Sequence, residues 1–149
     1  MSRTLEQFER VKRFLKCIEN QNKVSLDYDD ELWAFFQNCW HLKDFIKYDS
    51  TLHSSITSRV ETNVKKIPSI CICADLCNRS KHSNLTKHIR KDARVAHKNV
   101  TIKLGNGEPV ISYEHIIVLK DGSKYNALDV ARNAVEEWEK LLKGYGLIK

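Results

Sequence analysis

Residues that break helices are scarce in the first two-thirds of this chain. The sequence holds two prolines, Pro68 and Pro109, and its glycines begin only at Gly105. Because proline and glycine interrupt regular helices, this scarcity predicts that the chain before residue 98 is mostly helical. Internal repeats and low-complexity tracts are also missing from the sequence, which argues against a repeat protein and against disorder.

Long hydrophobic runs are absent as well. No apolar stretch approaches the roughly 18 residues that a membrane span requires. The first residues, Met1 to Glu6, are polar and lack the apolar core of a signal peptide. The sequence therefore predicts a cytoplasmic protein without a membrane partner. Its 149 residues fit a single domain.

The five cysteines include no C-x-x-C pair, and their number is odd. Cys73 and Cys77 are four residues apart, on one face of a predicted helix, where two thiols could share a metal. A structural zinc site takes about four ligands, however. We therefore expect the cysteines to be small core-filling thiols in a reducing compartment, and we expect no metal or other cofactor.

Hydrophobic periodicity predicts long helices over residues 4–20, 28–48 and 68–83, and a short helix within residues 50–65. Thr4 is the candidate N-cap of the first helix. Asp29, Asp30 and Glu31 open the second helix, where the helix dipole favours acidic side chains. Pro68 suits the first turn of the third. Residues 84–97 fit either a helical extension or an ordered basic loop.

The pattern changes after residue 97. Residues 100–104, 110–119 and 123–125 read as strands, with a hairpin turn at Asp121–Gly122. Asn126 is a good N-cap for a last helix, which Gly144 should end. So small a sheet is not stable alone and should lean on the bundle through this helix.

We therefore predict one α+β domain over residues 1–149 that is mainly α. Its parts are a helical bundle (1–97), a two- to three-stranded antiparallel β-meander (98–125) and a C-terminal helix (126–144).

Acidic residues are nearly missing between residues 79 and 103. That stretch, called the basic segment below, holds eight lysines and arginines and a single acid, Asp92. Its net charge is +7, whereas the whole chain carries +6, so the remaining residues sum to −1. Such an excess favours a polyanion, RNA or DNA, or a phosphate ligand, although a solvated basic loop has the same composition. The candidate nucleic-acid-binding residues are Lys87, Arg90, Lys91 and Arg94.

Polar residues lie on helix faces that should be buried. Each helical residue turns about 100°, which places Asp75, Asn78 and His82 on the apolar face of helix 68–83. Asn38 and His41 likewise share the apolar face of helix 28–48, with Asp44 at its flank. A buried polar group costs about 1–3 kcal/mol if it is unpaired. We therefore expect these groups to pair with one another or to line a cleft where the two helices meet.

Four interpretations of this polar stripe remain open. It is a satisfied hydrogen-bond network that fixes helix register, a recognition surface without catalysis for nucleic acid or protein, a metal site, or a catalytic centre. A metal would use His41, Asp44, Asp75 and His82. Cleavage beside a ribose needs a proton acceptor, a proton donor and a cation for the phosphate. The candidate catalytic residues are His82, His41, Lys81, Arg79, Asn78 and Asp75.

The bundle and the string Asn78-Arg79-Ser80-Lys81-His82 resemble the HEPN superfamily of small helical domains, over residues 1–97 at most. The resemblance implies a metal-independent ribonuclease that works as a homodimer, often in toxin–antitoxin or antiphage systems. The signature of the superfamily is Arg, four to six residues, then His. Arg90 and His97 have that spacing, whereas two residues separate Arg79 from His82. The segment from Ala74 to His82 is also similar to uncharacterised bacterial proteins.

Overall fold

The computed structural model describes residues 1–20, 26–81, 93–103, 107 and 110–149. These form an α+β structure that is mainly helical, as predicted. The helices are α1 (Arg3–Asn20), α2 (Leu26–Lys47), α3 (Ser54–Thr57), α4 (Val60–Val64), α5 (Pro68–Lys81) and α6 (Ala127–Gly144). The strands are β1 (Arg94–Lys103), β2 (Val110–Val118) and β3 (Lys124–Asn126).

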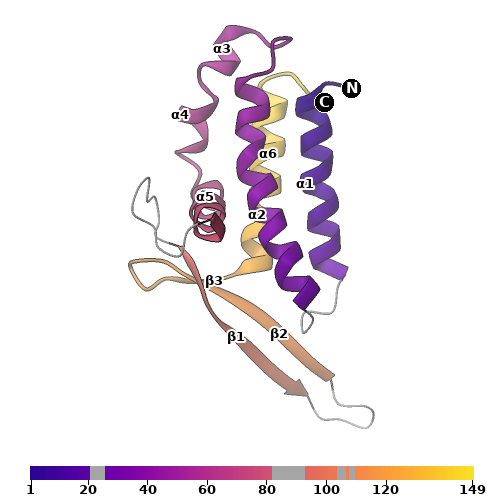
Figure 1. Cartoon of the computed structure of the whole chain (residues 1–149), viewed down its shortest axis with the longest axis vertical. Coiled ribbons are helices and arrows are strands. Elements are labelled where there is room, and N and C mark those ends of the chain that lie inside the picture. The colour runs from indigo at the N-terminus through magenta and orange to yellow at the C-terminus, as the bar shows by residue number, and fades with distance from the viewer. Residues whose placement is uncertain (21–25, 82–92, 104–106, 108–109) are drawn as a thin grey trace.

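Helix α2 is the centre of the bundle. It packs against α1, α5 and α6, and α1, α2 and α6 run side by side in Figure 1. Its buried aromatic residues Phe35 and Phe36 and the buried Trp138 of α6 belong to one hydrophobic core. The Trp138 Nε1–H also donates to the carbonyl oxygen of Cys39 at 3.1 Å, which ties α6 to the middle of α2.

Helix α1 begins one residue earlier than its sequence suggests. The Ser2 hydroxyl, rather than that of Thr4, accepts from a first-turn N–H, that of Leu5 at 3.2 Å. The Thr4 hydroxyl instead lies 3.2 Å from the Phe45 carbonyl oxygen and 2.7 Å from Asp49 Oδ2. Thr4 therefore joins α1 to the end of α2.

Helix α6 begins and ends where predicted, but the glycine that terminates it is Gly146 rather than Gly144. Asn126 Oδ1 accepts from the N–H groups of Leu128 and Asp129 at 2.9 and 3.2 Å. Gly144 lies within the helix, and the residue with positive φ is Gly146, at 72°. The N–H groups of Leu147 and Gly146 bond back to the last helical turn, which is the usual pattern of a glycine-terminated helix.

The sheet is antiparallel, with strand order β1-β2-β3. Strand β1 begins at Arg94, so the prediction that residues 94–97 extend the helix or form a loop is wrong. Residues 94–97 pair instead with residues 116–118 across a bulge between Val95 and His97. Residues 84–92, the rest of that ambiguous stretch, lie outside the described residues. The sheet therefore begins at residue 94 rather than after residue 97.

The sheet leans on the bundle as predicted, because β2 and β3 pack against α6, and β1 against α5. The ribbon of β1 and β2 continues past the ends of the helices in Figure 1. Between β2 and β3, Gly122 has φ 86°, and Asp121 Oδ1 accepts from the Ser123 N–H at 2.8 Å, which closes the predicted turn. No helix in the described part of the chain is long and apolar enough to cross a membrane.

Candidate functional site

His41 lies at the interface between α2 and α5, as its position on the helical wheel predicts. Its ring is half-buried, and Nε2 lies 3.7 Å from Cys77 Sγ on α5. His82, its proposed partner, lies outside the described residues. The structure thus brings His41 to the last turns of α5, within reach of the segment where the Asn78–His82 motif begins.

Asp75 and Arg79 form a clamp on the chain that enters the sheet. Asp75 is fully buried, and its Oδ2 accepts from the Ala93 N–H at 3.3 Å. One helical turn later, the Arg79 Nε–H donates to the Ala93 carbonyl oxygen at 2.7 Å. The N–H and the carbonyl oxygen of Ala93 are therefore both hydrogen-bonded to side chains of α5, immediately before β1 begins. We call this arrangement the Ala93 clamp.

Asn38 does not face α5, so the predicted pairing of Asn38 with the polar residues of α5 is wrong. Its Oδ1 accepts from Gln7 Nε2 at 3.1 Å, across the interface with α1, and its Nδ2 donates to the Ala34 carbonyl oxygen at 2.8 Å. Gln7, which is almost fully buried, also receives a bond from Arg10 at 2.6 Å. Asn38 and His41 lie about 60° apart on the same side of α2, yet Asn38 contacts α1 and His41 contacts α5.

The other candidate residues are spread more widely. Asp44 is partly exposed and accepts from Lys43 Nζ at 2.5 Å. Asn78 is half-buried on α5, and Lys81 ends that helix. Arg94 opens β1. Three candidates for nucleic-acid binding, Lys87, Arg90 and Lys91, lie outside the described residues.

The cysteines of α2 and α5 lie together in the core. All five cysteines are free, and Cys39, Cys71, Cys73 and Cys77 are buried. Burial above all, and then a hydrogen bond with Cys39, raises the pKa of the Cys73 thiol well above its ordinary value. Over the described residues, no three histidine, cysteine or acidic side chains are grouped closely enough to hold a metal ion. The thiols in α2 and α5 are thus buried, as predicted, whereas Cys17 of α1 is exposed, so the prediction of a core-filling thiol is wrong for that residue.

Sequence reasoning missed a second buried polar pair, at the other end of α2. The His115 Nε2–H of β2 donates to Asp29 Oδ1 at 2.6 Å, and the His115 side chain is 2% exposed. The Tyr28 ring packs against the same imidazole at a tilt of 46°, with 4.8 Å between ring centroids. The sequence did contain a signal, because His115 lies in the middle of an apolar strand. The acidic residues at the start of α2, however, were explained by the helix dipole alone.

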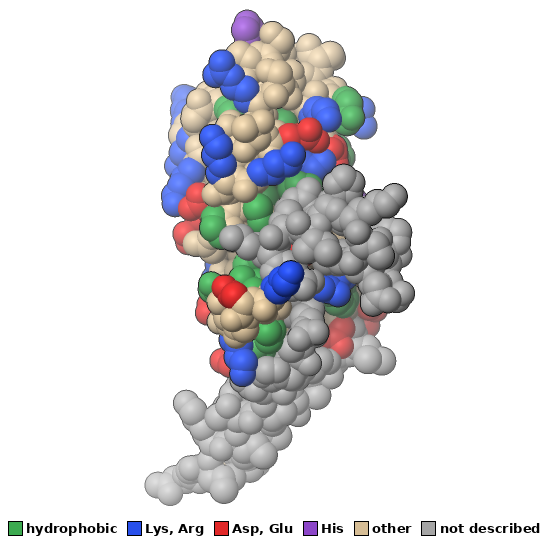
Figure 2. Space-filling view, turned by 90° about the vertical axis from the view of Figure 1, so that its left-hand side faces the viewer, with side chains coloured by type: hydrophobic (Ala, Val, Ile, Leu, Met, Phe, Trp, Pro, Cys, Tyr) green, Lys and Arg blue, Asp and Glu red, His purple; other side chains and the backbone are tan. Residues whose placement is uncertain are grey.

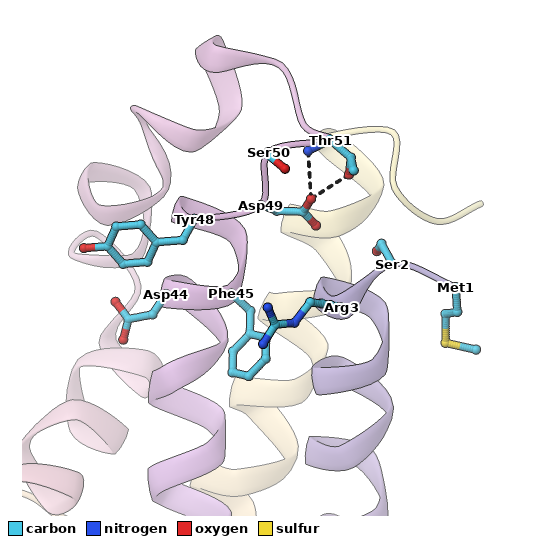
Figure 3. Close-up of a pocket in the computed structure, with 9 residues that line it drawn as sticks. All are labelled: Met1, Ser2, Arg3, Asp44, Phe45, Tyr48, Asp49, Ser50 and Thr51. Carbon is cyan, nitrogen blue, oxygen red and sulfur yellow. Dashed lines mark hydrogen bonds between the residues drawn. The ribbon is translucent and has the colours of Figure 1, made fainter.

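Sequence reasoning also missed a cavity, because its walls come from distant parts of the chain. It measures about 530 Å³ and lies where the start of α1 meets the end of α2 (Figure 3). We call it the α1–α2 pocket. It is lined by Met1, Ser2, Arg3, Asp44, Phe45, Tyr48, Asp49, Ser50 and Thr51.

No family model, curated protein or solved structure matches this chain. The chemistry of the residues described above is therefore what indicates a function.

Proposed function

We propose that this protein binds RNA through the basic segment, without cleaving it. The observation that carries the proposal is the Ala93 clamp, which fixes the middle of a stretch with a charge of +7. Asp75 and Arg79, two of the candidate catalytic residues, bond to the main chain there. Their observed contacts support a positioning role rather than a role in chemistry.

The clamp holds Ala93, which lies within the basic segment, against the bundle. Helix α5 ends at Lys81, and Ala93 lies against Asp75 and Arg79 of the same helix. The two described residues on either side of the interval 82–92 are therefore both attached to α5, Lys81 as its last residue and Ala93 through the clamp. Fixing both ends lowers the conformational entropy that binding must remove, which favours affinity for an extended anion.

The positive charge continues on a neighbouring face. Lysine and arginine side chains gather on the side of the molecule formed by α3 and α4 (Figure 2). The exposed residues Arg59, Lys65 and Lys66 belong to this part of the chain. Because α4 leads directly into α5, these cations extend the electropositive surface toward the basic segment. The resemblance of the Asn78–His82 string to the HEPN superfamily supports RNA as the polyanion.

A neutralised variant tests the proposal. Replacing Lys87, Arg90, Lys91 and Arg94 with glutamine should weaken binding to a fluorescent single-stranded RNA by about tenfold or more. It should also flatten the salt dependence, since each lost phosphate contact removes about 0.7 from the slope of log K against log salt. Fluorescence anisotropy at several salt concentrations measures both quantities.

The matched control removes the same number of charges elsewhere. Arg13, Lys16, Lys140 and Lys143 are exposed on α1 and α6, and their glutamine variant should keep most of the affinity and most of the salt slope. Equal losses in the two variants would show that only net charge matters, and the proposal would be wrong. Absent or salt-insensitive binding by the unmodified protein would also refute it.

Metal-independent RNA cleavage is the second candidate function. The position of His41 favours it, because a half-buried imidazole beside α5 is placed to move protons near neutral pH. In this proposal His41 and His82 exchange protons, while Lys81 or Arg79 neutralises the phosphate and Asn78 and Asp75 hold the site together. Gel analysis of the same RNA in EDTA decides between the candidates. If the protein cuts this RNA, and cutting is abolished in His41→Ala but retained in the control His53→Ala, RNA cleavage rather than binding alone is the function.

A further inference from the structure

The turn between β2 and β3 carries two lysines whose charges are not neutralised within the described part of the chain. Lys120 and Lys124 flank this turn, and both are exposed. Across the described residues, neither lysine forms an ion pair. By contrast, Lys140 and Lys143 on α6 are each paired with a glutamate. The two charges at the turn are therefore available to a ligand.

Hydrogen bonds within the turn fix the backbone that carries these lysines. The Leu119 N–H donates to the Ser123 carbonyl oxygen at 2.9 Å, and the Gly122 N–H donates to the Leu119 carbonyl oxygen at 3.0 Å. The carboxylate of Asp121 accepts from the N–H and the hydroxyl of Ser123 at 2.8 and 2.5 Å. Because the turn is already ordered, a ligand that binds there removes less conformational entropy.

The register of the sheet places this turn beside the start of β1, which belongs to the basic segment. Val118 of β2 pairs with Arg94 on one side and with Lys124 on the other. Residues that are directly opposite in antiparallel strands share a face of the sheet, so Arg94 and Lys124 share one face, two strand spacings or about 10 Å apart. Figure 1 shows the turn projecting beside the start of β1. The Ala93 clamp holds the residue that precedes Arg94.

We propose that Lys120 and Lys124 bind phosphates of the same RNA strand that the basic segment binds, so that the site continues across the sheet onto the β2–β3 turn. This inference rests on the RNA binding proposed above. A row of cations attracts a polyanion, and a lysine neutralises a phosphate without reading the base. The turn therefore adds affinity but no preference for a sequence.

A double variant of the full chain, Lys120→Gln with Lys124→Gln, tests the proposal by fluorescence anisotropy with a fluorescent single-stranded RNA. Loss of two phosphate contacts should reduce the slope of log K against log salt by about 1.4 and weaken binding by about tenfold at physiological salt. The loss should be similar for unrelated RNA sequences. Lys120→Arg with Lys124→Arg keeps both charges and should retain the affinity.

The matched control removes two charges from the other side of the molecule. Arg13 and Lys16 are exposed and form no ion pair with any described residue. They belong to α1, which lies on the opposite side of the bundle from the turn in Figure 1. Arg13→Gln with Lys16→Gln should keep the affinity and the salt slope. Because Lys120 and Lys124 are exposed, their replacement should leave the melting temperature unchanged, and a weaker affinity can be assigned to lost contacts with RNA.

Equal affinity and equal salt slope in the turn variant and in the α1 control would overturn the inference, while RNA binding by the basic segment would stand. A loss confined to one RNA sequence would also overturn it, because phosphate contacts do not distinguish sequences. The variant of the basic segment described above tests the proposed function separately, since it leaves both lysines of the turn in place. If the unmodified protein does not bind RNA, both proposals are wrong.

Discussion

His115 is held between β2 and the first turn of α2, where almost no water reaches it. Its Nε2–H has Asp29 as acceptor at 2.6 Å, and its ring has Tyr28 as neighbour. Buried polar groups are kept when their bonds are satisfied and become costly when a partner is removed. This pair therefore joins the sheet to the bundle at the scale of single side chains.

Asp29→Ala should lower the free energy of unfolding by about 1–3 kcal/mol, because it leaves the buried His115 nitrogen without its carboxylate. Asp30→Ala, at the exposed neighbouring position, should change it by less than about 0.5 kcal/mol. Urea denaturation measures both. A double-mutant cycle with His115→Leu isolates the pair, and a coupling energy near zero would contradict this account.

At the scale of elements, the Ala93 clamp decides where β1 begins. Strand propensity alone favours Val100–Leu104 as the start of the sheet, since the residues before it are polar and basic. Asp75 and Arg79 hold the backbone at Ala93, so the chain from Arg94 onward is placed to pair with β2. The early start of the strand is thus a consequence of contacts with α5.

Arg79→Met should loosen the start of β1 while it leaves α1 intact. The variant keeps much of the side-chain length but cannot donate to the Ala93 carbonyl oxygen. Amide hydrogen exchange at residues 94–98 should become faster, whereas exchange in the middle of α1 should not change. If the clamp also positions the basic segment, RNA affinity should fall more in Arg79→Met than in Arg59→Met. If hydrogen exchange at the start of β1 does not change, the Ala93 clamp does not determine where the strand begins.

For the whole molecule, stability should fall at alkaline pH. Burial first, and then the charge of Asp29, raises the pKa of Tyr28 above 10.0, while Arg132 acts in the opposite sense. Burial likewise raises the pKa of Cys73 above 9.0. A group with a raised pKa in the folded state stabilises the fold fully below its unfolded pKa, and that contribution is lost as the pH rises through the folded value.

The free energy of unfolding should therefore decline from about pH 9 upward, by at most about 1.4 kcal/mol per pH unit for each such group. Urea midpoints between neutral pH and about pH 11 measure the decline. Tyr28→Phe and Cys73→Ala should each flatten the profile, and Tyr125→Phe, at an exposed position, should not. A profile that is flat in the unmodified protein would show that these groups ionise equally in both states.

Much of the fold follows from local patterns. The stripe of Leu128, Ala131, Val135, Trp138 and Leu142 and the cap at Asn126 predict α6, and the scarcity of proline and glycine predicts the bundle. The candidate site follows less well. The helical wheel correctly predicted that His41 faces α5, but it wrongly predicted the same for Asn38. The angular position of a residue on a helix does not say which neighbouring helix packs against that side.

The amino-acid sequence by itself determined the helical class, the small sheet, the buried thiols of α2 and α5 and the concentration of charge between residues 79 and 103. These depend on periodicity, capping and composition, which act over a few residues. Only the tertiary structure decided the bonds of Asp75 and Arg79 to Ala93, the pairing of Asp29 with His115 and the α1–α2 pocket. Each of these joins residues far apart along the chain, and such contacts exist only once the helices have packed.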